Sequence, residues 1–197
     1  KIFLEKNMPV FIDKPLTVKT EELRYFNKYL NSGLLMSCSG LRYARELDAL
    51  RSNILDYGEI KLIRGAVVNN WEQYGIHLLE ALSSAIDYNP VSILPINAKH
   101  TSFIIQLDGG AIFQIDSLGN IPKTFSIDIW GTNKRSSHEI SDNFSTFRRT
   151  LSHFINLLKK GEIAIPAIET IKLIKIIIAG RIAQSENREV FIKEINV

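Results

Sequence analysis

The stretch Pro9-Val10-Phe11-Ile12-Asp13-Lys14-Pro15-Leu16 decides how this chain is interpreted. Its unbroken apolar run, Val10 to Ile12, is typical of a parallel strand covered on both faces. Pro15 cannot donate to a sheet ladder and biases Lys14 towards extended backbone, so the strand is expected to end there. Ligands of open α/β sheets bind just beyond the carboxyl ends of strands. Lys14 is therefore either a cation at a ligand site or a solvated lysine after an edge strand.

The first forty residues alternate between helix and strand. A short helix from Ile2 to Lys6 precedes the quoted strand, and Thr20 is expected to cap a helix that ends at Gly33. Residues 34–39 then predict a second short buried strand, so this part is typical of the tail of an α/β domain. An isolated strand would leave ladder groups unpaired. We therefore expect the chain, which begins with Lys1, to be the downstream part of a longer polypeptide or the product of truncation.

The rest of the chain predicts helices around a mostly antiparallel sheet. Helices are expected from residue 43 to Gly58 and over residues 71–87, and two long ones follow residue 143, separated by Gly161 and Pro166. Strands are expected over residues 59–68, 91–99, 101–107, 111–117, 124–130, 135–140 and 189–195. Asp108-Gly109-Gly110 predicts a tight hairpin. The fold class is therefore α+β, with residues 1–39 as the remnant of a dinucleotide-binding domain and residues 40–197 as a second domain. Its open sheet is expected to be covered on one face by helices.

Composition narrows the class of protein. The 197 residues are 45% hydrophobic and 23% charged, which is enough for a packed core. A net charge of +3 without a basic, aromatic-rich run argues against nucleic-acid binding. No apolar run is long enough to span a membrane. The single cysteine, Cys38, excludes a disulfide framework and favours a reducing, cytoplasmic setting, and no pair of histidines has metal-ligand spacing.

Several short motifs, in order, resemble one enzyme family. The stretch from Phe11 to Leu16 resembles the Glu-Lys-Pro signature that ends the nucleotide-binding domain in the glucose–fructose oxidoreductase / inositol dehydrogenase (Gfo/Idh/MocA) family. Leu41-Arg42-Tyr43 resembles the arginine-aromatic segment after the next strand, and Tyr74-Gly75-Ile76-His77 resembles the helix that projects a histidine into the active site. Gly161, Pro166 and the final helix also match the closing pattern of the family. Each motif is weak alone, but the ordered set covers nearly the whole chain.

The resemblance implies a hydride transfer between NAD or NADP and a sugar, polyol or related hydroxyl compound. Lys14 and His77 would be catalytic, with His77 as the general acid/base and Lys14 stabilising developing charge. Lys14 and Pro15 would lie near the cofactor. Arg42, Tyr43, Gln73 and Tyr74 would contact the substrate. The alternatives are a partly buried structural role for His77 and core or interface roles for the aromatic residues.

The chain also departs from the family pattern. Gln73 stands where an aspartate often precedes the histidine, and Ala44-Arg45 replaces the usual proline after the arginine-aromatic pair. No Gly-x-Gly-x-x-Gly is present, so the phosphate-binding turn is missing and this chain alone is expected to be inactive. A second hypothesis is therefore a non-catalytic remnant kept for oligomerisation or ligand binding. Under either hypothesis we expect a dimer or tetramer formed through the strands of residues 101–140.

Overall fold

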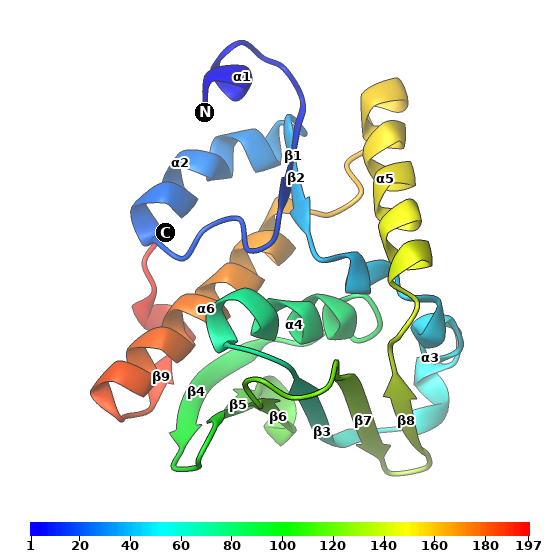
Figure 1. Ribbon diagram of the computed structural model, residues 1–197, viewed down its shortest axis with the longest axis vertical. Coiled ribbons are helices and arrows are strands. Elements are labelled where there is room, and N and C mark those ends of the chain that lie inside the picture. The colour runs from blue at the N-terminus through cyan, green and yellow to red at the C-terminus, as the bar shows by residue number, and fades with distance from the viewer.

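The computed structural model describes residues 1–197, which form two β-sheets with helices between and beside them (Figure 1). In the smaller sheet, β1 (Val10–Asp13) pairs in parallel with β2 (Leu35–Cys38). Helix α1 (Ile2–Glu5) precedes this sheet, and α2 (Thr20–Asn31) connects its two strands. The helix-and-strand alternation predicted for the first forty residues is confirmed. The predicted cap is off by one position, because Lys19 is the N-cap and Thr20 is already helical.

The β1 strand is less buried than its sequence predicts. Val10, Phe11 and Ile12 all remain partly exposed, whereas all four residues of β2 are buried. The strand has β2 along one edge and no strand along the other. Parallel pairing is therefore confirmed, but coverage on both faces is not.

The larger sheet has seven strands, in the order β8-β7-β3-β6-β5-β4-β9. Only β3 and β6 run parallel to each other; every other neighbouring pair is antiparallel. The predicted fold class, a mixed α+β chain with a mostly antiparallel sheet, is confirmed. The strands are β3 (Ile60–Val67), β4 (Pro90–Ile96), β5 (Thr101–Leu107), β6 (Ile112–Ser117), β7 (Phe125–Gly131), β8 (Arg135–Glu139) and β9 (Val190–Phe191).

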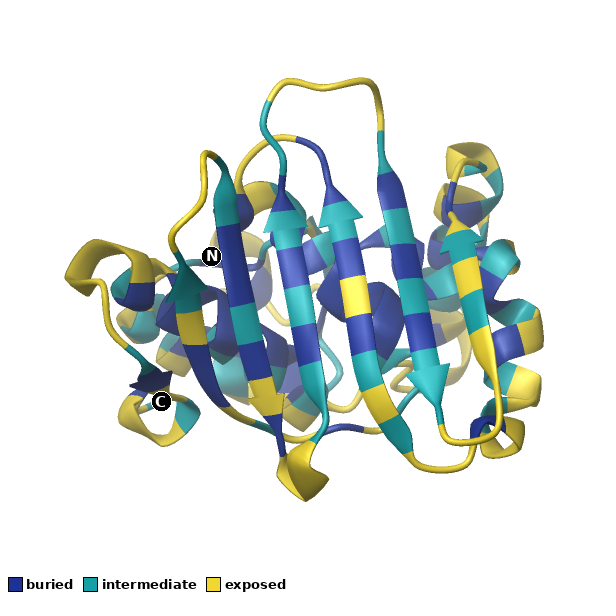
Figure 2. Ribbon diagram, turned by 90° about the horizontal axis from the view of Figure 1, so that it is seen from below, coloured by how far each residue is buried: buried dark blue, intermediate teal, exposed yellow.

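One face of this sheet forms the main core. Ile93, Ile105, Phe113, Ile63 and Ile129 lie opposite one another on adjacent strands and are fully buried. Helices α4 (Ile76–Ser83) and α6 (Ala167–Glu186) cover this face, while the opposite face carries no helix (Figure 2). Buried side chains from residues 1–39 and from residues 40–197 join one continuous hydrophobic cluster.

Two predicted helices are shorter than expected. The segment after residue 43 is not one helix but a series of 3₁₀ turns around α3 (Asp48–Ser52), because Arg51 donates hydrogen bonds to the backbone carbonyls of Arg42 and Ala44. The segment of residues 71–87 is a π turn (Trp71–Gly75) followed by α4. The last predicted strand is reduced to β9 and a 3₁₀ turn (Ile192–Glu194). These breaks arise from side-chain contacts that periodicity does not reveal.

The π turn is built around the indole of Trp71. Gly75 and Gly180 both lie against this ring, so closely that a Cβ atom at either glycine would clash with it. The indole N–H donates to the carbonyl of Ile177 at 3.1 Å, and the ring packs on Phe103 with centroids 4.7 Å apart. Trp71 thus joins the entrance of α4 to the middle of α6.

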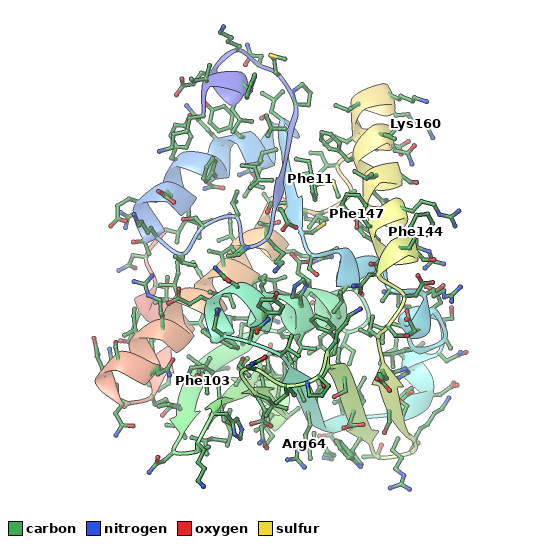
Figure 3. All side chains as sticks on the ribbon, viewed as in Figure 1. Phe11, Arg64, Phe103, Phe144, Phe147 and Lys160 are labelled. Carbon is green, nitrogen blue, oxygen red and sulfur yellow. The ribbon has the colours of Figure 1, made fainter.

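Helix α5 (Asn143–Lys160) lies beside the smaller sheet. It begins at the N-cap Asp142 and ends at Gly161, whose positive φ of 69° completes the predicted stop. Phe154 packs on Phe11 of β1 with ring centroids 5.8 Å apart, and Figure 3 shows Phe11 on the side of β1 that faces α5. Phe144 and Phe147, at the start of the helix, are exposed. No helix of the chain is both long enough and apolar enough to cross a membrane.

Candidate active site

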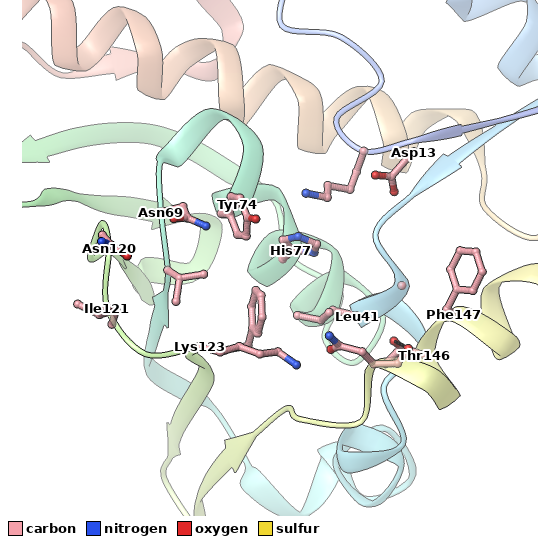
Figure 4. Close-up of a pocket in the computed structure, with 15 residues that line it drawn as sticks. Asp13, Leu41, Asn69, Tyr74, His77, Asn120, Ile121, Lys123, Thr146 and Phe147 are labelled. Carbon is pink, nitrogen blue, oxygen red and sulfur yellow. Dashed lines mark hydrogen bonds between the residues drawn. The ribbon is translucent and has the colours of Figure 1, made fainter.

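The largest cavity lies where the carboxyl end of β1 meets the start of α4 and the start of α5 (Figure 4). Its volume is about 590 Å³, which is in the range of small-molecule sites. The loop between β6 and β7 closes one side. Fifteen residues line it: Asp13, Lys14, Gly40, Leu41, Val68, Asn69, Tyr74, His77, Asn120, Ile121, Lys123, Phe125, Asn143, Thr146 and Phe147.

Lys14 enters this cavity from the end of β1. Its Nζ donates a hydrogen bond of 2.7 Å to the carbonyl of Gln73 and lies 4.8 Å from the centre of the Tyr74 ring. Burial lowers the pKa of Lys14, and the nearby Asp13 carboxylate opposes that effect. The side chain therefore takes up the neutral amine form more readily than a solvated lysine does.

His77 faces the same cavity from the first turn of α4. Tyr74 precedes it by three residues on the same side of the helix, with ring centroids 5.4 Å apart, and Phe125 meets it edge-on at 5.2 Å. Burial, followed by the charge of Lys14, lowers the pKa of His77 to about 3. The imidazole is therefore neutral at physiological pH.

Ser39 contacts His77 but does not line the cavity. It follows β2 directly, is fully buried, and places its Oγ 2.6 Å from His77 Nδ1. The backbone N–H of Leu41 donates to the same Oγ at 3.0 Å. This serine is absent from the motifs that suggested the site, because its partner is 38 residues away in sequence.

Two predicted substrate residues do not line the cavity. Arg42 is buried and donates to Glu80 at 2.5 Å and to Glu169 at 3.0 Å. Burial acts to lower the pKa of Arg42, but the two carboxylates outweigh it and raise that pKa, so the guanidinium keeps its charge. Tyr43 stacks on His153 with centroids 4.1 Å apart. In this structure Arg42 and Tyr43 therefore make contacts within the protein, and their predicted contact with a substrate stays a prediction.

The remaining predicted residues differ in whether they line the cavity. Tyr74 lines the cavity, whereas the side chain of Gln73 is exposed and only its carbonyl reaches Lys14. Pro15 follows Lys14 but does not line the cavity. The geometry thus brings Lys14, Tyr74 and His77 together out of the predicted set.

Polar residues that sequence reasoning missed complete the cavity. Asn69 pairs with Gly119 in a short antiparallel bridge, in which the N–H of Asn69 donates to the carbonyl of Gly119 at 2.7 Å, and Asn120 follows Gly119 in the chain. Asn143 and Thr146 come from the first turn of α5. The one sequence signal for this set is the Leu118-Gly119-Asn120 turn, which marks a loop but not its position. Amide and hydroxyl groups of this kind suit a ligand with several hydroxyls.

Comparison with solved structures shows that the fold is a known one. No protein-family model and no curated protein sequence matches the chain. The fold superposes on scyllo-inositol dehydrogenase from Lactobacillus casei with bound NAD(H) and scyllo-inositol (TM-score 0.80, 14% identity, 96% of this chain and 75% of that chain). It also superposes on myo-inositol dehydrogenase from Corynebacterium glutamicum (0.79, 11%, 95% and 74%) and on GenD2 of gentamicin A biosynthesis in complex with NAD (0.76, 12%, 96% and 73%). The chain thus shares its fold with inositol dehydrogenases and related oxidoreductases.

Proposed function

We propose that the chain is the C-terminal part of an NAD(P)-dependent oxidoreductase of the Gfo/Idh/MocA family, acting on a sugar, polyol or related hydroxyl compound. The observation that carries this proposal is the meeting of Lys14 and His77 in one cavity, although 63 positions separate them in the sequence. The cavity lies at the carboxyl end of a parallel strand pair, where α/β folds bind ligands. Three asparagines around it supply hydrogen bonds for a polyhydroxylated substrate.

Oxidation of an alcohol requires two catalytic groups from the protein. One group must take the proton of the hydroxyl as the carbon loses its hydride, and another must stabilise the charge on the oxygen. Lys14 and His77 are the two cavity residues suited to these roles. The family resemblance assigns the proton to His77 and the charge to Lys14.

Only the nicotinamide end of the cofactor would contact residues of this chain. When bound, nicotinamide accepts or gives the hydride. By the family resemblance, Lys14, which directly follows β1, would lie near the nicotinamide end, with Pro15 next to it. The sequence contains no Gly-x-Gly-x-x-Gly turn for the pyrophosphate, so tight binding requires residues beyond those of this chain. NAD and NADP are equally compatible with these residues.

Titration calorimetry with NAD(H) and NADP(H) tests the proposal. We expect no tight binding by this chain, and binding by a polypeptide that adds a nucleotide-binding domain in front of Lys1. Inositols and sugars are then screened for turnover, and Lys14→Met should lower kcat by about 100-fold or more. Ser136→Ala, on the edge strand β8, is the matched control and should keep its activity. Failure of the longer polypeptide to bind either cofactor would refute the oxidoreductase assignment.

A non-catalytic ligand-binding or oligomerisation module is the second candidate. The exposed, neutral Gln73 favours it, because an amide cannot take a proton from a substrate. Under this function the cavity would bind a polyol with no turnover in any form of the protein. A calorimetric signal with inositols, together with no cofactor binding, would select it.

We also propose that the uncovered sheet face forms an interface between copies of this chain. Leu62, Ile112 and Trp130 lie side by side on this face and are partly exposed. An apolar strip on a face without helices is typical of subunit contacts. Sedimentation at micromolar concentration should detect a dimer or tetramer.

A further inference from the structure

The turn after β2 and helix α4 are joined by two matched contacts. Ser39 meets His77, and Arg42 meets Glu80, so the partners are 38 residues apart in both cases. Within each element the two residues are three positions apart, which places them on the same side of a helical turn. The buried Arg42–Glu80 ion pair therefore fixes the register that sets Ser39 against His77.

The hydrogen-bond capacity of Ser39 decides which nitrogen of His77 carries the proton. A serine hydroxyl has one hydrogen to donate. Its oxygen already accepts from the N–H of Leu41, and the residue is fully buried, so the hydroxyl hydrogen needs an acceptor inside the protein. The acceptor within hydrogen-bond distance is His77 Nδ1, 2.6 Å from the Oγ of Ser39. A neutral imidazole that accepts at Nδ1 carries its hydrogen on Nε2.

We infer that Ser39 is a positioning residue that holds His77 as the neutral Nε2–H tautomer, so that His77 donates a hydrogen bond to the substrate oxygen and Lys14 exchanges the proton. This inference rests on the proposed function and reverses the roles that the family resemblance gives. In the oxidation, the hydroxyl proton passes to the neutral amine of Lys14 and the carbon gives its hydride to the oxidised nicotinamide. A C=O bond forms as the O–H and C–H bonds break, and the Nε2–H of His77 remains bonded to the oxygen.

The surroundings of the two residues support this division of roles. The titratable groups that line the cavity are Asp13, Lys14, Tyr74, His77 and Lys123. No carboxylate hydrogen-bonds to His77, and Gln73 replaces the acid that would stabilise an imidazolium. Burial lowers the pKa of both His77 and Lys14, which keeps the imidazole neutral and increases the share of free amine on Lys14. A neutral histidine that polarises an oxygen is an established catalytic arrangement.

Nitrogen-15 NMR of the histidine rings in this chain tests the tautomer without cofactor or turnover. We expect His77 to be the Nε2–H tautomer at pH 7 and to remain neutral at pH 5. In Ser39→Ala, the two tautomers should mix. Ser136→Ala, which removes the partner of His138, is the matched control and should leave the His77 signals unchanged. An Nδ1–H tautomer or an imidazolium at His77 in the unmodified chain would overturn the inference.

The pH profile of the longer, cofactor-binding form tests the role of Lys14. His77→Gln keeps an N–H donor, so it should retain the acidic limb of kcat/KM for oxidation, which is the rise with pH as Lys14 loses its proton, with a loss of about tenfold. Lys14→Arg cannot act as a base near neutral pH and should lose about 100-fold or more, together with that limb. Loss of the limb in His77→Gln, with its retention in Lys14→Arg, would overturn the assignment. Absence of activity in every form would refute the proposed function and the role of Lys14, whereas the NMR result on Ser39 would still decide the tautomer.

Discussion

Two serine–histidine pairs in this chain have nearly the same length and different surroundings. Ser39 Oγ lies 2.6 Å from His77 Nδ1, and Ser136 Oγ lies 2.7 Å from His138 Nε2. Ser39 is fully buried, whereas Ser136 is partly exposed on the edge strand β8 and accepts from the hydroxyl of Tyr57. The contact alone is therefore ordinary. Each serine oxygen also accepts one further hydrogen bond, so burial of the serine is what distinguishes the first pair: Ser39 has no water to donate to and must donate to His77.

The largest effect should come from the ion pair that supports Ser39. Arg42→Met leaves Glu80 buried without its partner, which should cost about 3–5 kcal/mol of unfolding free energy. Arg45→Met, which removes the exposed ion pair with Asp142, is the matched control and should cost less than about 1 kcal/mol. Urea unfolding measures both. Equal losses in the two variants would contradict the supporting role of Arg42.

A second prediction concerns the pH dependence of the stability, through His77. The folded pKa of His77 is about 3, below its usual 6.5, so between these values the unfolded chain binds a proton that the folded chain does not. Stability should therefore fall as the pH decreases through this window, by at most about 1.4 kcal/mol per pH unit from this residue. His77→Gln should remove that contribution, as measured by urea unfolding between pH 4 and pH 7. An unchanged slope in His77→Gln would contradict this contribution.

The serines themselves should differ by a smaller amount. Ser39→Ala leaves a buried imidazole nitrogen and the Leu41 N–H without their partner, at a cost of about 1–3 kcal/mol. Ser136→Ala removes the partner of the Tyr57 hydroxyl and of His138 on a strand open to water, and should cost less than Ser39→Ala. Chemical unfolding of the two variants compares them directly. If Ser136→Ala were the more damaging, burial would not be what distinguishes the pairs.

The smallest effect on the folded chain is expected on the uncovered sheet face. Trp130→Asp places a charge in the apolar strip of partly exposed residues and should change monomer stability by less than about 1 kcal/mol. In sedimentation it should shift a dimer or tetramer to monomers. Lys61→Asp, at an exposed position on β3, is the control. A parent chain that is already monomeric would refute the proposed interface.

The sequence predicts the helices and strands and one end of the candidate site. Strand and turn signals, with apolar alternation clearest on β5 and β6, predict the strands of the larger sheet, and the abrupt end of the apolar run at Asp13-Lys14-Pro15 marks the place where the cavity lies. Both signals are local, because they depend on which neighbours along the chain share a face. The final strand was predicted too long, since the Glu194 side chain accepts from the N–H of Phe191 and turns the chain there.

The remainder of the site depends on contacts that no local pattern contains. Arg42 was expected in the pocket because of its motif, but Glu80 on α4 holds it in the core. No sequence motif marks Ser39, although it contacts the predicted histidine. Both outcomes follow from the packing of one helix against one turn across 38 residues. The register of this packing depends on which charged groups are buried together and on how the side chains fit. The periodicity of the sequence contains neither.

The indole of Trp71 has a consequence for how this sequence can vary. Gly75 and Gly180 are 105 positions apart, yet both lack a side chain for the same reason, since one ring fills the space of each. Alanine at either position is tolerated only if the residue at position 71 becomes smaller. A smaller residue at position 71 would remove the steric restriction on both glycine positions. Substitutions at the three positions should therefore be strongly epistatic, and among related sequences we expect them to change together.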